Sequence, residues 1–388
     1  MKKAGCWLLV AMLVVASIPV GPANGCSLCD SKAFSSPTLR QEAAYPSAKI
    51  MLLGEITNSR TTGGTAGETD FLIKKVLRKH PLIRDKSKLV LPRYLPINDP
   101  KHPPQYLLFC DVDGEKLDPY RGILLVQKDS PEYVEQALSM TQRDPAQQLE
   151  FYFRYLDHAD PEISRDAFFE FAKARDQDIL KAGKAFSADK VRSWVKDPAT
   201  PAQKLGLYAL LLGICGKDED VDYLKSLLRS GEERHVQAAD GILAGFMQQK
   251  PREGWDFLIS TLKDDKQSLL LRLAMIRAVR FNFNADPKKN RKHLVDAMEV
   301  LLRQGDMADI AIEDLRNLGV WDHSRLILSL FGKEGYKSPL VKRSIIRYAL
   351  SAETSPEIQA FLAQRKQQDA DDYQDVVDGL KLERANKN

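Results

Sequence analysis

The chain has 388 residues, of which 44% are hydrophobic and 28% charged, and its formal net charge is +4. This length exceeds what a single hydrophobic core usually holds, so we expect two domains or a repeat array. The hydrophobic fraction excludes a largely disordered chain. The small net charge gives no bulk electrostatic argument for binding nucleic acid or an anionic membrane.

The first 25 residues have the pattern of a secretory signal peptide. Lys2 and Lys3 precede an apolar run at 7–18, and residues 19–25 break a helix and place small side chains before Cys26. The apolar run is too short for a membrane-spanning helix, which needs about 20 residues. We therefore expect cleavage before Cys26 and a mature protein in the periplasm, cell envelope or extracellular space, without a transmembrane helix.

A cysteine at the expected new N-terminus raises the alternative of a lipid anchor at Cys26. A lipid-attachment motif has an aliphatic residue three positions before the cysteine, directly after the apolar run. Here Ala23 takes that position, and two prolines separate it from the apolar run. We therefore favour cleavage without lipidation over a lipid anchor.

Residues 48–127 contain five short segments with the composition and turn residues of β-strands. They are 48–58, 68–79, 88–96, 105–112 and 120–127. Five short strands within about 80 residues indicate a small barrel or sandwich. We expect a small, mostly β domain at 26–129.

From Ser130 onward the apolar residues recur at helical spacing, and a two-helix unit repeats. Equivalent positions before an apolar helix are separated by 40, 33, 34, 40 and 33 residues; they are Asp157, Asp197, Ser230, Asp264, Gln304 and Lys337. Such periods are typical of helical solenoids. We expect an all-α solenoid at 130–368 and a capping helix with a charged tail at 369–388.

The helical half resembles the HEAT/armadillo repeat proteins over about 157–366. The second helix of a HEAT repeat follows a pattern of valine, arginine and small residues, and segments 236–245, 271–279 and 341–350 match it. The resemblance implies that small residues let neighbouring helices approach closely. It also implies a concave surface that holds a protein or peptide.

The β segment resembles the netrin-like (NTR) version of the OB barrel, a family that includes the tissue inhibitors of metalloproteases. The similarity covers 26–128 and rests on a cysteine-rich start, the strand end at 54–56, the strand at 71–77 and a later strand with Cys110. The family begins Cys-x-Cys, whereas this chain has Cys-x-x-Cys. The resemblance implies an OB-like barrel, and the different spacing speaks against protease inhibition through the Cys26 amine.

The cysteines are expected to form a structural disulfide. The Cys26-x-x-Cys29 pair is followed by Asp30, so it lacks the histidine of a haem attachment site. In an oxidising compartment we expect Cys29, or alternatively Cys26, to pair with Cys110 and attach the N-terminal segment to the β domain. Closing a loop of about 80 residues contributes about 4 kcal/mol. We expect Cys215 to be a buried free thiol.

The most basic stretch of the chain is 74–88. Its cations are Lys74, Lys75, Arg78, Lys79, Arg84, Lys86 and Lys88. One interpretation is a contact with an anionic polysaccharide, a lipid head group or an acidic partner. The alternative is a solvated strand face followed by a loop.

Five arginines belong to the second helices of the predicted repeats. They are Arg272, Arg277, Arg280, Arg343 and Arg347. Two interpretations stay open. The arginines form a structural ladder with acids of neighbouring repeats, or they line a basic inner groove that holds a peptide or an anionic ligand.

No catalytic pattern emerges. The six histidines are scattered, and the chain has no metalloprotease, nucleophile-elbow, phosphate-loop or dinucleotide motif. We therefore expect an exported, non-enzymatic scaffold or adaptor without a cofactor or metal, which binds a protein or peptide on the concave face of a solenoid. One alternative is a binder of an anionic glycan or envelope component through the basic stretch, and another is a thiol-redox or hydrolytic enzyme. Nucleic acid is not an expected partner, because export separates the protein from it.

Overall fold

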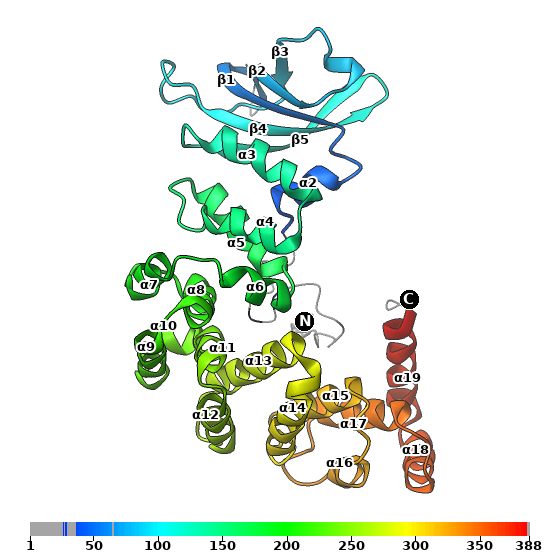
Figure 1. Ribbon diagram of the computed structural model, residues 1–388. Coiled ribbons are helices and arrows are strands. Elements are labelled where there is room, and N and C mark those ends of the chain that lie inside the picture. The colour runs from blue at the N-terminus through cyan, green and yellow to red at the C-terminus, as the bar shows by residue number, and fades with distance from the viewer. Residues whose placement is uncertain (1–25, 27, 29–35, 64–65, 386–388) are drawn as a thin grey trace, which may run out of the picture. The chain divides into compact units, whose positions relative to one another are not determined.

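The computed structural model describes residues 26, 28, 36–63 and 66–385. A five-stranded antiparallel sheet is followed by helices from Ser130 to Ala385 (Figure 1). This order confirms the predicted change from β to α structure near residue 130. The chain divides into two compact units between Ala297 and Met298, so the sheet and the helices that directly follow it share one unit. The predicted signal peptide lies outside the described residues.

The sheet consists of β1 (Ile50–Gly63), β2 (Ala66–Arg78), β3 (Lys88–Leu91), β4 (Gln105–Asp113) and β5 (Lys116–Leu125). Its strand order is β3-β2-β1-β4-β5, which makes β3 and β5 the edges. The strand β3 is shorter than its predicted segment, because Pro92 has no N–H to continue the ladder. Pro119 lies on the other edge strand, beside an irregularity of the β4–β5 register.

One face of the sheet forms a core of its own. Its buried residues come from all the strands except β5 and from the short 3₁₀ turn η1 (Pro81–Ile83); they are Ile50, Leu52, Ile56, Phe71, Ile83, Leu89, Leu91, Leu108 and Cys110. Gly54 is required at this face, because a Cβ there would lie 2.6 Å from the Phe71 ring and 2.2 Å from the carbonyl oxygen of Leu72. This face therefore has a hydrophobic core formed by the strands and η1.

The opposite face of the sheet packs against helices (Figure 1). The contact is made by the short helix α2 (Leu39–Ala44), by α3 (Ser130–Ser139) and by α5 (Pro161–Lys173). Asp160 caps the N-terminus of α5 by accepting the Glu162 N–H at 3.0 Å, and Pro161 occupies the first turn.

The remaining helices of the first unit follow in chain order. They are α4 (Pro145–Phe153), α6 (Asp176–Gly183), α7 (Ala188–Lys196), α8 (Ala202–Cys215), α9 (Asp218–Arg229), α10 (Glu233–Gln237), α11 (Ala239–Gln249), α12 (Pro251–Lys263) and α13 (Leu269–Ala285). The helix α14 (Pro287–Leu301) contains the division between the units. Helices α10 and α11 are separate elements, because the chain turns at Ala238.

Helices α8 and α11 cross with their backbones in contact. A Cβ on Gly213 would lie 2.0 Å from the Gly245 carbonyl oxygen, and one on Gly241 would lie 2.1 Å from the Gly206 carbonyl oxygen. Larger side chains at these positions are incompatible with this spacing. Small residues therefore allow the close approach between second helices that the sequence predicts, and α11 in turn packs on α13.

The second unit contains α15 (Ala308–Asn317), α16 (Ser324–Leu330), α17 (Pro339–Ser351), α18 (Pro356–Gln368) and α19 (Ala370–Ala385). Within it, α17 packs on α15 and α19 packs on α17. The Tyr348 hydroxyl donates to the Val320 carbonyl at 2.6 Å and attaches α17 to the loop after α15. Alternate helices are therefore neighbours here, as they are in the first unit.

Candidate anion-binding site

A surface hollow with a volume of ≈ 450 Å³ lies where β2 ends and η1 begins. We call it the basic hollow. Its lining consists of Val76, Lys79, His80, Pro81, Ile83 and Arg84. Three of these side chains are basic, three are apolar and none is acidic.

The backbone of η1 positions the basic side chains. Ile83 is buried in the core of the sheet, which fixes the turn against the strands. His80 caps the turn, because its Nδ1 accepts the Leu82 N–H at 3.3 Å. Lys79 and Arg84 lie on either side of this anchored turn and are exposed.

His80 contributes a donor to the hollow. Its Nδ1 accepts the Leu82 amide, so the neutral ring carries its proton on Nε2. The ring nitrogen that remains for a ligand is therefore an N–H group. Together with the Lys79 ammonium and the Arg84 guanidinium, this gives a site with donors and no side-chain acceptor.

The structure separates the basic stretch into two groups. Four cations have partners within the fold: Lys74 with Glu55 at 2.9 Å, Lys75 with Glu135 at 2.5 Å, Lys88 with Asp70 at 3.0 Å, and Arg78 with the Ala48 carbonyl. Among the described residues, no ion pair involves Lys79, Arg84 or Lys86, and all three are exposed. These three are the cations that an external anion can approach without displacing an internal partner.

The arginines proposed for an inner groove take part in internal ion pairs. Arg277 Nε donates to Asp240 Oδ2 at 2.5 Å, joining α13 to α11. Arg343 pairs with Asp372 at 2.7 Å, and Arg347 pairs with Glu313 at 2.8 Å.

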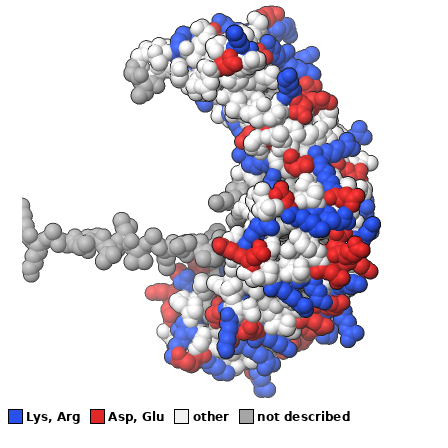
Figure 2. All heavy atoms as spheres, turned by 90° about the vertical axis from the view of Figure 1, so that its left-hand side faces the viewer, with Lys and Arg blue, Asp and Glu red and all other residues white. Residues whose placement is uncertain are grey.

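Of the remaining two groove candidates, Arg272 is buried and Arg280 is partly buried. A further pair joins Arg192 to Asp220 between α7 and α9. These contacts favour the structural ladder over a basic groove. On the face that Figure 2 draws, acidic and basic side chains are interspersed.

The predicted disulfide stays a prediction, because Cys29 lies outside the described residues. Cys110 is a free thiol, fully buried in the core of the sheet, and burial raises its pKa to about 12. Cys26 is fully buried as well, and its amide donates at 2.7 Å to the Ala172 carbonyl at the end of α5. Because α5 packs on the helix-covered face and Cys110 faces the other side of the sheet, the structure does not bring Cys26 and Cys110 together.

Neither Cys110 nor Cys215 has the environment of a reactive cysteine. Burial raises the pKa of the partly buried Cys215 to about 11, and a raised pKa disfavours the nucleophilic thiolate. The thiol-redox alternative rests on the Cys26–Cys29 pair, and Cys29 lies outside the described residues.

Sequence reasoning missed a buried acidic cluster between the sheet and α5. It consists of Glu42, Asp160, Asp166 and Glu170, all of them buried. Acidic residues in helices are usually solvated, so their spacing gives no signal of burial. Tyrosines and arginines donate to three of these carboxylates, Glu42, Asp166 and Glu170. Asp160 accepts instead from the Ser130 hydroxyl and from backbone amides.

Comparison of the chain with protein-family models, with curated proteins and with solved structures finds no match. Within the described ranges, no group of three or more His, Cys, Asp or Glu residues is placed to hold a metal ion. The same part of the chain has no helix that combines the length and the apolar character needed to cross a membrane.

Proposed function

We propose that this protein is an exported, non-enzymatic binding protein that holds an anionic group of an envelope component or glycan in the basic hollow. The observation that carries the proposal is the convergence of Lys79, His80 and Arg84 on one hollow without a carboxylate in its lining. Charge-assisted hydrogen bonds from such donors favour phosphate, sulfate or carboxylate groups. The volume of ≈ 450 Å³ is in the range of small-molecule sites.

The apolar part of the lining limits the kind of ligand. Val76, Pro81 and Ile83 offer no hydrogen-bond donor from their side chains. A bare inorganic anion would leave this surface uncovered. We therefore favour an anionic group that is attached to a larger body, such as a sulfated or phosphorylated sugar.

We also propose that the sheet is an OB-like barrel and that the helices form a HEAT-like array. The self-contained core on one sheet face supports the first statement, and so does the bond from Arg93 Nη2 to the Pro119 carbonyl at 3.2 Å, which joins the segment after β3 to β5. The stacking of alternate helices supports the second. A scaffold role for the concave face stays a prediction from the resemblance, because the ion pairs of Arg277, Arg343 and Arg347 occupy the cations proposed for it.

The test is a binding titration with dextran sulfate, with neutral dextran as the negative control, at low and high salt. We expect dextran sulfate alone to bind and its affinity to fall as ionic strength rises. The double variant K79A/R84A should lose at least tenfold in affinity, because hydrogen bonds to charged groups contribute about 1.5–3 kcal/mol each.

The matched control is K74A/K75A, which removes the same charge from lysines that already have internal partners. We expect it to change the affinity less than threefold. An equal loss in both double variants would show a response to net charge alone and would contradict a defined site.

A further inference from the structure

The N-terminal segment 36–44, which includes α2, is bound along α5. We call this segment the strap. The Leu39 N–H donates to Asp166 Oδ1 at 2.7 Å. One turn further along α5, Arg40 donates to both oxygens of Glu170, at 2.7 Å from Nη2 and 3.3 Å from Nε. The strap therefore has two adjacent polar contacts with α5, both to buried carboxylates.

The other side of the strap is bound to β5. Glu42 is buried and accepts hydrogen bonds from the Tyr120 hydroxyl at 2.9 Å and from Arg121. Three residues of the strap thus join the sheet to α5. Detachment of the strap would weaken the contact between these two elements.

Asp166 lies at the centre of this junction. Its Oδ2 accepts the Tyr133 hydroxyl at 2.6 Å, so each of its oxygens has one donor. Within the described part of the chain, no cation forms an ion pair with Asp166, whereas Glu170 has Arg40. Burial, and to a lesser extent the nearby Glu170 charge, raise the pKa of Asp166 to about 7.

Charged and titratable groups face Asp166 from every element around it. They are Arg40 and Glu42 on α2, Arg121 on β5, Tyr133 on α3, Tyr152 on α4, and Glu162, Arg165 and Glu170 on α5 itself. The cations in this set have other carboxylates to pair with: Arg40 pairs with Glu170, Arg121 with Glu42, and Arg165 with Glu162. An ionised Asp166 is therefore a buried charge without a cation of its own.

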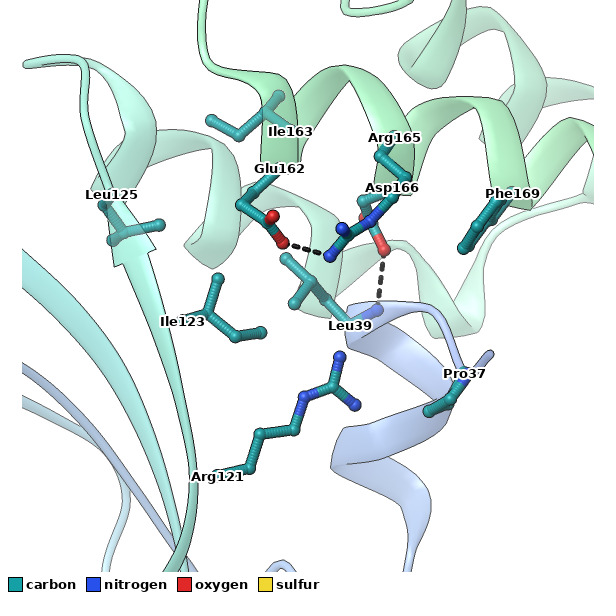
Figure 3. Close-up of a pocket in the computed structure, with 10 residues that line it drawn as sticks. All are labelled: Pro37, Leu39, Arg121, Ile123, Leu125, Glu162, Ile163, Arg165, Asp166 and Phe169. Atoms are coloured by element: carbon teal, nitrogen blue, oxygen red, sulfur yellow. Dashed lines mark hydrogen bonds and ion pairs between the residues drawn. The ribbon is translucent and has the colours of Figure 1, made fainter. Parts of the chain in front are cut away.

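A small cavity lies beside this carboxyl group (Figure 3). Its volume is ≈ 20 Å³, about the space that one water molecule needs. Figure 3 shows Ile123 and Leu125 of β5 on one side and Ile163 of α5 on the other, with the Leu39–Asp166 hydrogen bond at its edge. The packing around Asp166 is therefore incomplete on the side where the strap lies.

We propose that Asp166 is a proton-dependent switch for the strap, which stays attached to α5 while the carboxyl is protonated and detaches more readily once it is ionised. The proton of a protonated Asp166 lies on Oδ2 and is donated to the Tyr133 oxygen, which reverses that hydrogen bond. Oδ1 stays a carbonyl oxygen for the Leu39 N–H, so the contact with the strap survives protonation. Ionisation places a charge in a buried site that already holds Glu170. Detachment relieves this cost by exposing Asp166 to water.

The direction of the effect follows from linkage. The pKa of Asp166 is about 7 with the strap attached, and its ordinary value in water is 3.8. The attached state binds the proton more tightly, so attachment is favoured at low pH and weakens as pH rises. The detachment constant should increase about tenfold per pH unit between about 4 and 7, about 10³-fold in all, and then level off.

Hydrogen–deuterium exchange of the whole protein measures this directly. After division by the intrinsic exchange rate at each pH, we expect the protection of amides 39–44 to fall as pH rises from 5 to 7 and to level off above 7. Amides of α17, a helix of the second unit that contains no acidic residue, provide the internal reference and should show no such change. A flat profile for amides 39–44 in the wild type would overturn the proposal, without any variant being needed.

Two variants identify the group that titrates. Asp166→Asn keeps the size of the side chain but cannot ionise, so the pH dependence at 39–44 should disappear. Asp240→Asn is the matched control, because it makes the same change at a buried aspartate of α11 that pairs with α13. It should leave the pH dependence at the strap intact. Persistence of that dependence in D166N, or its loss in D240N, would contradict the assignment.

Discussion

Asp240 and Arg277 are 37 residues apart in the chain and form an ion pair at 2.5 Å between α11 and α13. The Asp240 side chain is 7% exposed and that of Arg277 is 33% exposed. Burial raises the pKa of Asp240, and the Arg277 charge opposes this rise. The pair therefore neutralises a carboxylate that helix packing has removed from water.

Arg277→Ala should destabilise the first unit, because it leaves Asp240 buried without its cation. Breaking a buried pair costs about 3–5 kcal/mol, and partial exposure of the arginine reduces this to about 2–3 kcal/mol. Urea unfolding monitored by circular dichroism measures the loss. The double variant D240N/R277M should recover most of it, and a loss that persists in the double variant would assign the effect to packing.

Gly245→Ala should disrupt the crossing of α8 and α11. The added Cβ would lie 2.2 Å from the Ala209 carbonyl oxygen, so the two backbones must separate. We expect a loss of about 1–3 kcal/mol in the free energy of unfolding, the usual cost of overpacking. Gly122→Ala is the control, since its Cβ has no neighbour closer than 3.6 Å. Similar losses for both variants would contradict a specific close contact.

The free energy of unfolding should depend on pH through Asp166. The folded-state pKa of about 7 lies above the ordinary value of 3.8, so the folded protein binds this proton more tightly. Asp166 therefore makes its full contribution to the free energy of unfolding below pH 4. This contribution, about 4 kcal/mol in total, is lost as pH rises to 7. Denaturant titrations at several pH values should show D166N gaining about this much relative to the wild type between pH 4 and 7. If the difference in unfolding free energy between D166N and the wild type is the same at every pH, the pKa of Asp166 is not raised by folding.

Cys110 should resist alkylation in the native protein. Its thiol is fully buried, so the reagent cannot reach the sulfur. Burial also raises its pKa to about 12, so almost none of the reactive thiolate is present at pH 8. Iodoacetamide labelling with peptide mass mapping should modify Cys110 only in denaturant if it is free. A Cys29–Cys110 peptide in the non-reduced map would instead establish the predicted disulfide.

The local sequence was sufficient to predict the order of secondary-structure types. Alternation and turn residues mark the strands before residue 127, and the change to helical spacing at Ser130 coincides with the start of α3. Asp160 and Pro161 mark the start of α5, because capping depends on residues within one helical turn. The length of β3 was overestimated, although Pro92 carried the information needed to end it.

The tertiary structure alone decided which charged residues remain available. Lys75 and Lys79 belong to the same basic stretch, but only Lys75 lies opposite an acid of α3, at Glu135. The burial of Asp166 likewise arises from the packing of α2, α3 and β5 around one helix. The spacing of apolar residues predicts a helix or a strand, because the interactions that form such an element involve residues close together in the chain. The partner of a charge depends on which distant elements meet, and a single sequence does not contain that information in local form.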